Sequence, residues 1–355
     1  MNYYSEDNKN IFVMIGPHQV TIKDIAKRLK ISVSTVSRAL RGSVDISDET
    51  RKLVLSVAEE LHYSPNPIAL SLRDKKTKVI GVIVQEIANN YCSSVIAGIE
   101  DIAFKMGYNV LISQSHEKLD IEILNASLLA SRRIDGLLIT ISNETKNTDH
   151  LKEMIARGIP VVMFDRVSDD LKTHKVVVDD YKGAFDATSH LIEQGYKRIA
   201  HLTISKHLAI TQNRLNGYLD ALKVHKIPVK KEWIIYCDFD ETNIKNEIKK
   251  LVIGPKRPNA IFSSVERLSM VGVKILNDLK LKVPDDVALA GFADNPMNHY
   301  LNPSLTAVCQ PTFSIGQNAT ELLIELIESK KAEEKHTTVK LKTTLDIQES
   351  SLRKS

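Results

Sequence analysis

The sequence is poor in the features that mark secreted and membrane proteins. Its 355 residues include only three cysteines, which lack CxxC spacing and are too scattered for a disulfide framework, so we expect a reducing compartment. No segment approaches the roughly 20 consecutive apolar residues that span a bilayer. The first residues also lack the basic start, long apolar stretch and cleavage site of a secretory signal. We therefore expect a cytoplasmic protein with no membrane partner.

Motifs that carry catalytic chemistry are missing as well. The sequence contains no GxGxxG, P-loop, GxSxG or HExxH pattern. Its 11 histidines are dispersed and lack the paired spacing of metal ligands. We expect no enzyme activity, no cofactor and no metal site, with an enzyme on an α/β scaffold as an alternative.

What the sequence does have is positive charge near one end. Residues 18–78 hold 12 Lys and Arg against 7 Asp and Glu, whereas residues 79–355 hold 35 of each. The chain is 43% hydrophobic and 26% charged, which is a globular balance, and its length suits two or three domains. The basic segment suggests a polyanionic partner, with a merely soluble basic face as the alternative.

Residues 20–63 show the pattern of three short helices. Thr21, Ser32 and Ser47 are suitable N-caps, and Gly42 is placed to end the second helix. Apolar residues at helical spacing form the inward faces: Ile22, Ile25, Ala26 and Leu29, then Val36, Ala39 and Leu40, then Leu53, Val54, Val57, Ala58 and Leu61. Two short helices braced by a third predict a helix-turn-helix, with a protein-binding bundle as the alternative.

The second helix leaves small polar residues and an arginine outside, which suits a major groove. The runs VTIKDIA (20–26), SVSTVSRAL (32–40), SDETR (47–51) and YSPN (63–66) resemble the headpiece of the LacI/GalR family of transcription regulators. The resemblance implies that Val33, Ser34 and Arg38 face base edges. Thr35 shares this surface, and the residues implied to contact phosphates are Thr21, Ser32, Ser37 and Thr50.

Residues 64–78 read as a hinge. Pro65 stiffens its entry, and a helix of six or seven residues is unstable alone because nucleation is costly. The family resemblance implies paired hinge helices in the minor groove, with Asn66 and Ala69 among the DNA contacts and Leu72 as an apolar wedge. An ordinary interdomain linker is the alternative.

After residue 78 the pattern changes to alternating strands and helices. Strands are expected at 79–84, 109–113, 136–141, 160–164 and 175–178, and then at 198–203, 234–236, 259–263 and 287–291, each short and apolar as if buried on both faces. Two series of βα units predict an α/β core with two lobes of parallel sheet and a ligand cleft at the strand ends.

This region resembles the periplasmic-binding-protein-like core of the same family, for example in PVVMFDR (160–166) and RLNGY (214–218). The expected divisions are 1–19, a disordered leader; 20–63, the headpiece; 64–78, the hinge; 79–348, the core; and 349–355, a tail. Within the core, the first lobe is expected at 79–178 and 309–338, and the second at 179–306 and 339–348.

The resemblance also implies a set of effector-binding residues. They are Asn89, Tyr91, Asp165, Arg166, Arg214, Phe239, Glu266, Asp294 and Gln310. Three segments depart from the family pattern: Val265-Glu266 replaces Asn-Asp, Ala293-Asp294 replaces Asp-Asp, and 88–92 lacks the usual Ser-Asn-Pro and aromatic pair. Glu266 and Asp294 could substitute for the missing groups, or the effector could be phosphorylated or acidic, or the cleft could bind weakly.

The sequence therefore predicts a DNA-binding transcriptional regulator, by family default a repressor, controlled by a small carbohydrate-derived effector. Its expected partners are double-stranded operator DNA, the effector and a second copy of the chain, because no leucine-heptad tail for a tetramer follows residue 347. A sugar-binding receptor without DNA is the competing hypothesis, and the N-terminal helices and missing export signal count against it.

Overall fold

The computed structural model describes residues 20–64, 76–238, 240–329 and 335–353. The chain divides into two compact units, residues 1–77 and 78–355. The expected leader and most of the hinge, with Asn66, Ala69 and Leu72, lie outside the described residues.

The first unit contains the three expected helices, α1 (Ile22–Leu29), α2 (Val33–Leu40) and α3 (Asp48–Glu60). The Asp24 carboxylate accepts from the backbone N–H and the hydroxyl of Thr21 at the start of α1. Ser32 and Ser47 cap α2 and α3 by accepting from backbone N–H groups one turn along. After α2, Gly42 takes a left-handed backbone with φ of 71°, the conformation that ends helices.

The core of this unit confirms most of the expected inward residues. Ile25, Val36 and Val54 are completely buried. Leu53 is an exception, because its exposed fraction is 52%. Position 53 lies about 100° around the helix from Val54, at the margin of the apolar stripe, so the prediction that Leu53 points inward was wrong.

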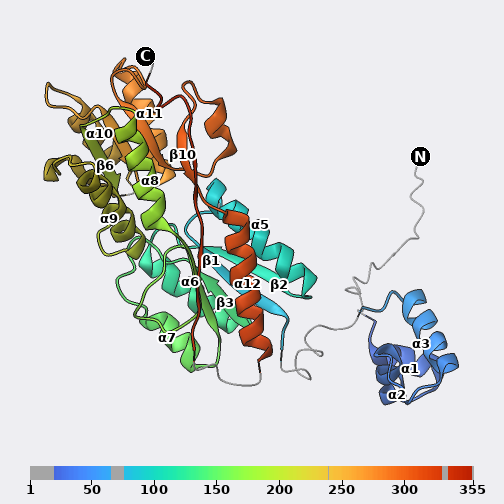
Figure 1. Cartoon of the computed structure of the whole chain (residues 1–355). Coiled ribbons are helices and arrows are strands. Elements are labelled where there is room, and N and C mark those ends of the chain that lie inside the picture. The colour runs from blue at the N-terminus through green and yellow to red at the C-terminus, as the bar shows by residue number, and fades with distance from the viewer. Residues whose placement is uncertain (1–19, 65–75, 239, 330–334, 354–355) are drawn as a thin grey trace, which may run out of the picture. The chain divides into compact units, whose positions relative to one another are not determined.

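The second unit has two lobes, each built on a six-stranded sheet (Figure 1). The first sheet has the order β11-β5-β4-β3-β1-β2 and is parallel throughout. Its strands are β1 (Val79–Val84), β2 (Asn109–Gln114), β3 (Gly136–Ile139), β4 (Val161–Phe164), β5 (Lys175–Val178) and β11 (Thr338–Leu341). The helices α5 (Asn90–Lys105) and α12 (Thr312–Glu328) pack on one face, and α6 (Leu119–Ser131) and α7 (Asp149–Ala156) on the other.

The second sheet has the order β12-β10-β9-β8-β6-β7, with only β12 antiparallel to its neighbour. Its strands are β6 (Ile199–Thr203), β7 (Ile234–Tyr236), β8 (Ala260–Ser263), β9 (Ala288–Phe292), β10 (Thr306–Cys309) and β12 (Thr344–Asp346). The helices α8 (Asp180–Glu193) and α9 (Ala209–Val224) cover one face, and α10 (Glu241–Val252) and α11 (Glu266–Asp278) the other. Two short 3-10 turns, Lys231–Trp233 and Pro296–Tyr300, complete the lobe.

The chain passes between the lobes three times, after β5, after β10 and after β11. The third passage was expected at 338/339, but residues 338–341 pair with β5 in the first sheet, so it falls at 342–343. Residues 349–355 were expected to form a tail. Ser350 and Ser351 are instead buried against the second sheet, where the Ser350 hydroxyl donates to the Leu289 carbonyl at 2.6 Å.

The expectation of strands buried on both faces holds for the central strands and fails at the edges. Strands β3, β4, β8 and β9 are buried along their whole length. Strands β2 and β7 stand at the edges of their sheets and are partly exposed, because each has a neighbour on one side only. None of the described helices is long and apolar enough to cross a membrane.

The helices α5 and α12 approach each other closely through glycines (Figure 1). A Cβ on Gly98 would clash with the backbone carbonyl of Phe313, and one on Gly316 would clash with that of Val95. Because α12 directly follows the second passage between the lobes, this packing positions the chain where it enters the first lobe.

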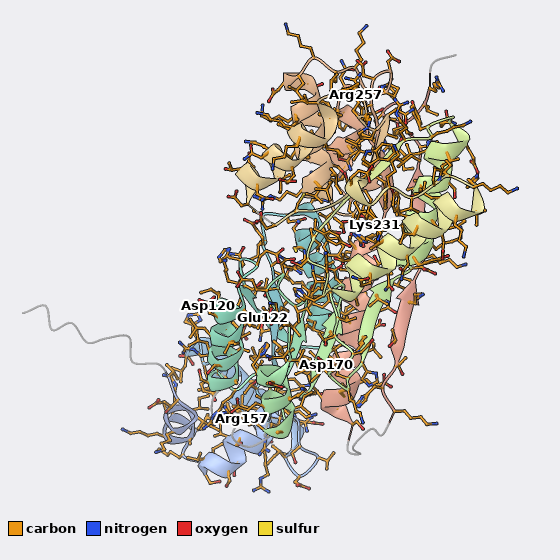
Figure 2. The ribbon with its side chains drawn as sticks, turned by 90° about the vertical axis from the view of Figure 1, so that its left-hand side faces the viewer. Asp120, Glu122, Arg157, Asp170, Lys231 and Arg257 are labelled. Carbon is orange, nitrogen blue, oxygen red and sulfur yellow. The ribbon has the colours of Figure 1, made fainter. Side chains whose placement is uncertain are left out.

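A buried carboxylate anchors the loop after β3. Glu122 on α6 (Figure 2) is fully buried and accepts from the Ser142 backbone at 2.6 Å and from the Thr145 hydroxyl at 3.0 Å. His150 Nε2 lies 3.0 Å from the same carboxylate. These contacts hold the segment that leads from β3 to α7, beside the carboxyl ends of the first sheet.

Candidate functional site

The outer face of α2 carries the residues expected to read DNA. Val33 is 42% exposed, and Ser34 and Arg38 are also exposed. Within the described residues, the Arg38 side chain makes no hydrogen bond or ion pair, so its guanidinium is available to a partner. The arrangement suits bidentate recognition of guanine and apolar contact with a thymine methyl group.

The residues expected to contact phosphates lie around this face. Thr21 and Ser32 are exposed, and Ser37 and Thr50 are half-buried. Ser32 Oγ accepts from the Thr35 backbone at 3.0 Å, so this hydroxyl has a structural role as well. Contact of these residues with DNA stays a prediction.

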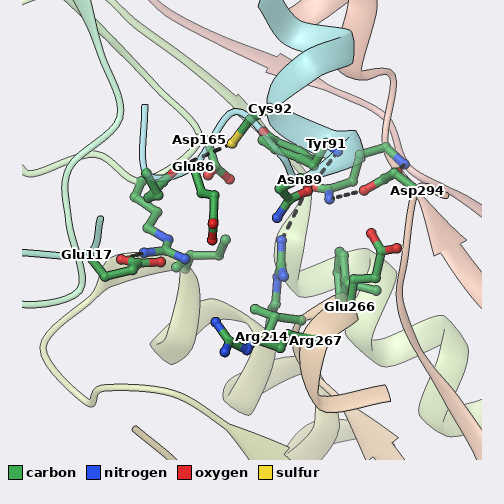
Figure 3. A pocket seen from close by; sticks show the side chains of 16 residues that line it. Glu86, Asn89, Tyr91, Cys92, Glu117, Asp165, Arg214, Glu266, Arg267 and Asp294 are labelled. Carbon is green, nitrogen blue, oxygen red and sulfur yellow. Dashed lines mark hydrogen bonds and ion pairs between the residues drawn. The ribbon is translucent and has the colours of Figure 1, made fainter. Parts of the chain in front are cut away.

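The candidate effector residues gather around one cavity between the two lobes (Figure 3). The cavity encloses roughly 750 Å³ of space, its open mouth included. All the expected effector residues that the structure describes line it, namely Asn89, Tyr91, Asp165, Arg166, Arg214, Glu266, Asp294 and Gln310. Phe239 lies outside the described residues. Their contact with an effector stays a prediction.

Arg214 on α9 is the best-connected of these side chains. Its Nε donates to Asp180 at 2.7 Å, its Nη2 donates to Gln310 at 3.3 Å, and its Nη1 donates to the Ser264 carbonyl. The guanidinium carbon lies 3.5 Å from the centre of the Phe292 ring. Asp180 follows the first passage and Gln310 the second, so Arg214 ties both passages to the second lobe.

Arg166 is likewise held by contacts with the protein, in this case within the first lobe. Its side chain is buried at the end of β4, and Nη1 donates to Glu117 at 2.7 Å. Glu117 also accepts from the Asn143 backbone at 2.8 Å. Asp165 precedes Arg166 with a left-handed backbone, φ of 58°, a conformation that aspartate tolerates better than most residues.

The second lobe contributes two carboxyl groups. Asp294 accepts from the Gln310 side chain at 2.7 Å, and its carbonyl accepts from Asn90 of the first lobe at 2.7 Å. Burial raises the pKa of Asp294 to about 7, against the hydrogen bonds from Gln310. Burial also raises the pKa of Glu266, whose Oε2 is buried and has no hydrogen-bond partner among the described residues.

Tyr91 and Asn89 form the wall at the start of α5. Asn89 caps the helix, since its side chain accepts from the Tyr91 backbone at 2.8 Å. The Tyr91 ring is 9% exposed, and its buried hydroxyl is engaged by the Asp165 carboxyl. Burial, followed by the nearby carboxylates of Asp165 and Asp294, raises the pKa of Tyr91.

Several cavity residues were missed by sequence reasoning. They are Gln85, Glu86, Cys92, Glu117, Ile210, Val265, Arg267 and Phe292. Gln85 and Glu86 follow β1 directly, Glu117 comes shortly after β2, and Phe292 ends β9. The rule that ligands lie at the carboxyl ends of parallel strands could have found these four.

A helix-turn-helix module joined to a two-lobed core with a polar cavity defines a class of protein, the ligand-responsive DNA-binding regulators. Comparison with known proteins agrees. Residues 21–66 match the model for bacterial regulatory proteins of the lacI family, and residues 77–349 match that for periplasmic binding proteins and the sugar binding domain of the LacI family. The chain belongs to the lacI family of bacterial regulatory proteins.

Individual relatives cover nearly the whole chain. The ribose operon repressor of Haemophilus influenzae is 31% identical over 93% of this chain and 98% of its own. Catabolite control protein A of Priestia megaterium is 32% identical over 86% of this chain and 91% of its own. The lac repressor dimer bound to operator and the anti-inducer ONPF superposes with a TM-score of 0.81 over 94% of this chain and 99% of that one, and at 22% identity it supports the fold.

Proposed function

We propose that this regulator is a repressor that binds operator DNA as a homodimer and that a small polar effector in the interlobe cavity controls its affinity. The main observation that supports this proposal is the exposed face of α2, where the Arg38 side chain is available to a partner. The chain also belongs to a family of DNA-binding regulators. Two headpieces related by a twofold axis would read two half-sites of a near-palindrome.

The interlobe cavity is the proposed binding site for the effector that controls operator affinity. Polar side chains from both lobes converge on it, and Arg214 connects it to the residues beside two of the passages between the lobes. An effector that binds one relative placement of the lobes more tightly shifts the population toward it and thereby changes operator affinity. A carbohydrate-derived effector is supported by the family model of a sugar binding domain.

This proposed function also implies roles for individual residues and a location in the cell. We assign DNA contact to the α2 face and to Asn66, Ala69 and Leu72 of the hinge, and effector contact to the cavity residues. We place the protein in the cytoplasm, where its DNA is, and assign it no enzymatic activity, because its relatives are transcription regulators.

The test is a salt titration of duplex binding. A duplex selected from random oligonucleotides is titrated with the full chain by fluorescence anisotropy at several salt concentrations. Affinity should fall steeply with salt, because phosphate contacts release counterions. Arg38→Ala should cost about 1–3 kcal/mol on the selected duplex and reduce its advantage over random DNA. Lys52→Ala, an exposed charge change on α3, is the matched control and should leave sequence preference intact.

A fragment lacking residues 1–73 separates the two functions. Residues 78–355 form their own compact unit, so the fragment should fold, dimerise and keep its effector response while losing specific DNA binding. Specific binding by this fragment, or the absence of any preferred duplex for the full chain, contradicts the proposal.

A further inference from the structure

The interlobe cavity is more acidic than its arginines suggest. Five carboxyl side chains line it, against three guanidinium groups. The carboxyl groups are Glu86, Glu117, Asp165, Glu266 and Asp294, and the guanidinium groups are Arg166, Arg214 and Arg267. A negatively charged ligand would add to the charge that is already in excess.

The two buried arginines are engaged by the chain itself. Arg214 donates from all three of its nitrogens to Asp180, Gln310 and a backbone carbonyl. Arg166 donates to Glu117 at 2.7 Å. Arginine recognises phosphate and carboxylate through pairs of donors, and both guanidinium groups already donate to protein acceptors, Arg214 to three of them and Arg166 to Glu117. Arg267 is exposed at the mouth of the cavity.

Carboxyl groups of the second lobe also face the cavity. Glu266 Oε2 is buried without a partner among the described residues, while the Asp294 backbone and the Asn295 side chain hydrogen-bond the same carboxyl group. The buried hydroxyl of Tyr91 is engaged by the Asp165 carboxyl. The Asp294 carboxyl nearby accepts hydrogen bonds from the backbone and the side chain of Gln310, at 2.5 and 2.7 Å. Figure 3 shows Tyr91, Asp294 and Glu266 on the same side of the cavity.

We infer that the effector is a polyhydroxylated small molecule that carries a protonated amine, an amino sugar or a related compound, with the amine between Glu266 and Asp294. A neutral sugar would supply hydroxyl donors but no charge, so these carboxyl groups would be neutralised only by taking up protons, whereas an ammonium group donates three hydrogen bonds and neutralises them directly. The raised pKa of Asp294 agrees, because the empty cavity already favours a proton at this position. The inference rests on the proposed function and specifies its effector.

The test compares ligands that differ at one position. Glucose, glucosamine and N-acetylglucosamine, the matching galactose and mannose series, and the hexose 6-phosphates are titrated into the full chain at about pH 6.5, where a sugar amine is protonated. Binding is measured by calorimetry and thermal shift. We expect at least one amine to bind about tenfold or more tightly than both its hydroxyl and its acetamide counterparts, and the phosphates to bind worst.

Isosteric variants locate the amine. Glu266→Gln and Asp294→Asn, made singly and together, should each reduce the preference for the amine over the hydroxyl sugar, and the double variant should abolish it. Asp170→Asn, an exposed change in the first lobe, is the control and should leave the preference unchanged. The single variants keep the comparison available if the double variant does not fold.

Three outcomes overturn the inference: tighter binding of a neutral sugar or a phosphate, an amine preference that survives in the double variant, or no binding by any amine. Operator binding by the same preparation separates this failure from that of the proposed function. A chain that binds its operator and responds to a neutral sugar keeps the function and loses only the cationic effector.

Discussion

The carboxyl group of Asp294 should make the stability of the empty core depend on pH in the neutral range. Burial is the main cause that raises its pKa from 3.8 to about 7, and the nearby Glu266 carboxylate adds to the effect. The backbone and side chain of Gln310, and the charge of Arg214, act in the opposite direction. Asp294→Asn removes the titrating group and keeps the shape of the side chain.

The sign follows from linkage between proton binding and folding. A carboxyl whose folded-state pKa is raised stabilises the fold fully below its unfolded pKa, and that contribution is lost as the pH rises through the folded pKa. With 3.8 in the unfolded state and about 7 in the folded state, the loss extends over about pH 4 to 8. Between about pH 5.5 and 8 it amounts to about 1–2 kcal/mol, at 1.36 kcal/mol per pKa unit.

The assay is thermal unfolding of the full chain without ligand, for wild type and Asp294→Asn, at several pH values. At about 2–4 °C per kcal/mol, the difference between their melting temperatures should change by about 2–8 °C across this range, in favour of the variant at high pH. Asp180, whose pKa burial raises to about 6, titrates in both proteins, so its contribution cancels in the difference. Asp170→Asn should follow the wild type. A constant difference between Asp294→Asn and wild type would refute the reasoning.

Three further changes test the packing and the DNA contacts. Gly98→Ala should lower the free energy of unfolding by about 1–3 kcal/mol in urea denaturation, because the new methyl group meets the backbone of Phe313. Gly272→Ala on α11 should be neutral or stabilising, because its methyl group would make only an ordinary van der Waals contact with Leu289. Equal effects would contradict the close approach of α5 and α12. Glu122→Gln should cost about 1–3 kcal/mol in the same assay because it places amide donors among donors, and the exposed Asp120→Asn on the same helix should cost little. Leu72→Ala should weaken binding of the selected duplex far more than of random DNA in anisotropy titrations, and equal losses would argue against a wedge.

Local sequence signals were sufficient where one interaction decides the structure. Ser32 and Ser47 begin helices because a hydroxyl accepts from a backbone N–H one turn on, and the structure confirms both caps. The central strands were predictable because burial on both faces requires continuous apolar runs. The family resemblance extended this reading to a DNA-binding headpiece followed by a periplasmic-binding-protein-like core, and the family models confirm both.

The place of each strand in its sheet was harder to predict, because the residues of a strand do not specify which other strands will pair with it. The apolar pattern of 109–114 does not reveal that β2 is an edge strand. The third passage between the lobes was misplaced because 338–341 has an alternation that suits either sheet, and only its pairing with β5 decides. Ser350 and Ser351 looked like a polar tail, yet hydrogen bonds to the second sheet make them part of the core.

The sign of the charge in the interlobe cavity was the property most difficult to predict from the sequence. Arg166 and Arg214 stand out in the family pattern, and a reading from sequence left an acidic or phosphorylated effector open. Whether an arginine can hold such a ligand depends on its other partners, and Glu117 and Asp180 come from distant parts of the chain. Those two carboxylates engage the arginines, whereas no arginine or lysine forms an ion pair with Glu266 or Asp294 among the described residues, and one oxygen of Glu266 is buried without a hydrogen-bond partner there. On the proposed function, the segments that depart from the family pattern would select the ligand, and our inference is that they select for positive charge.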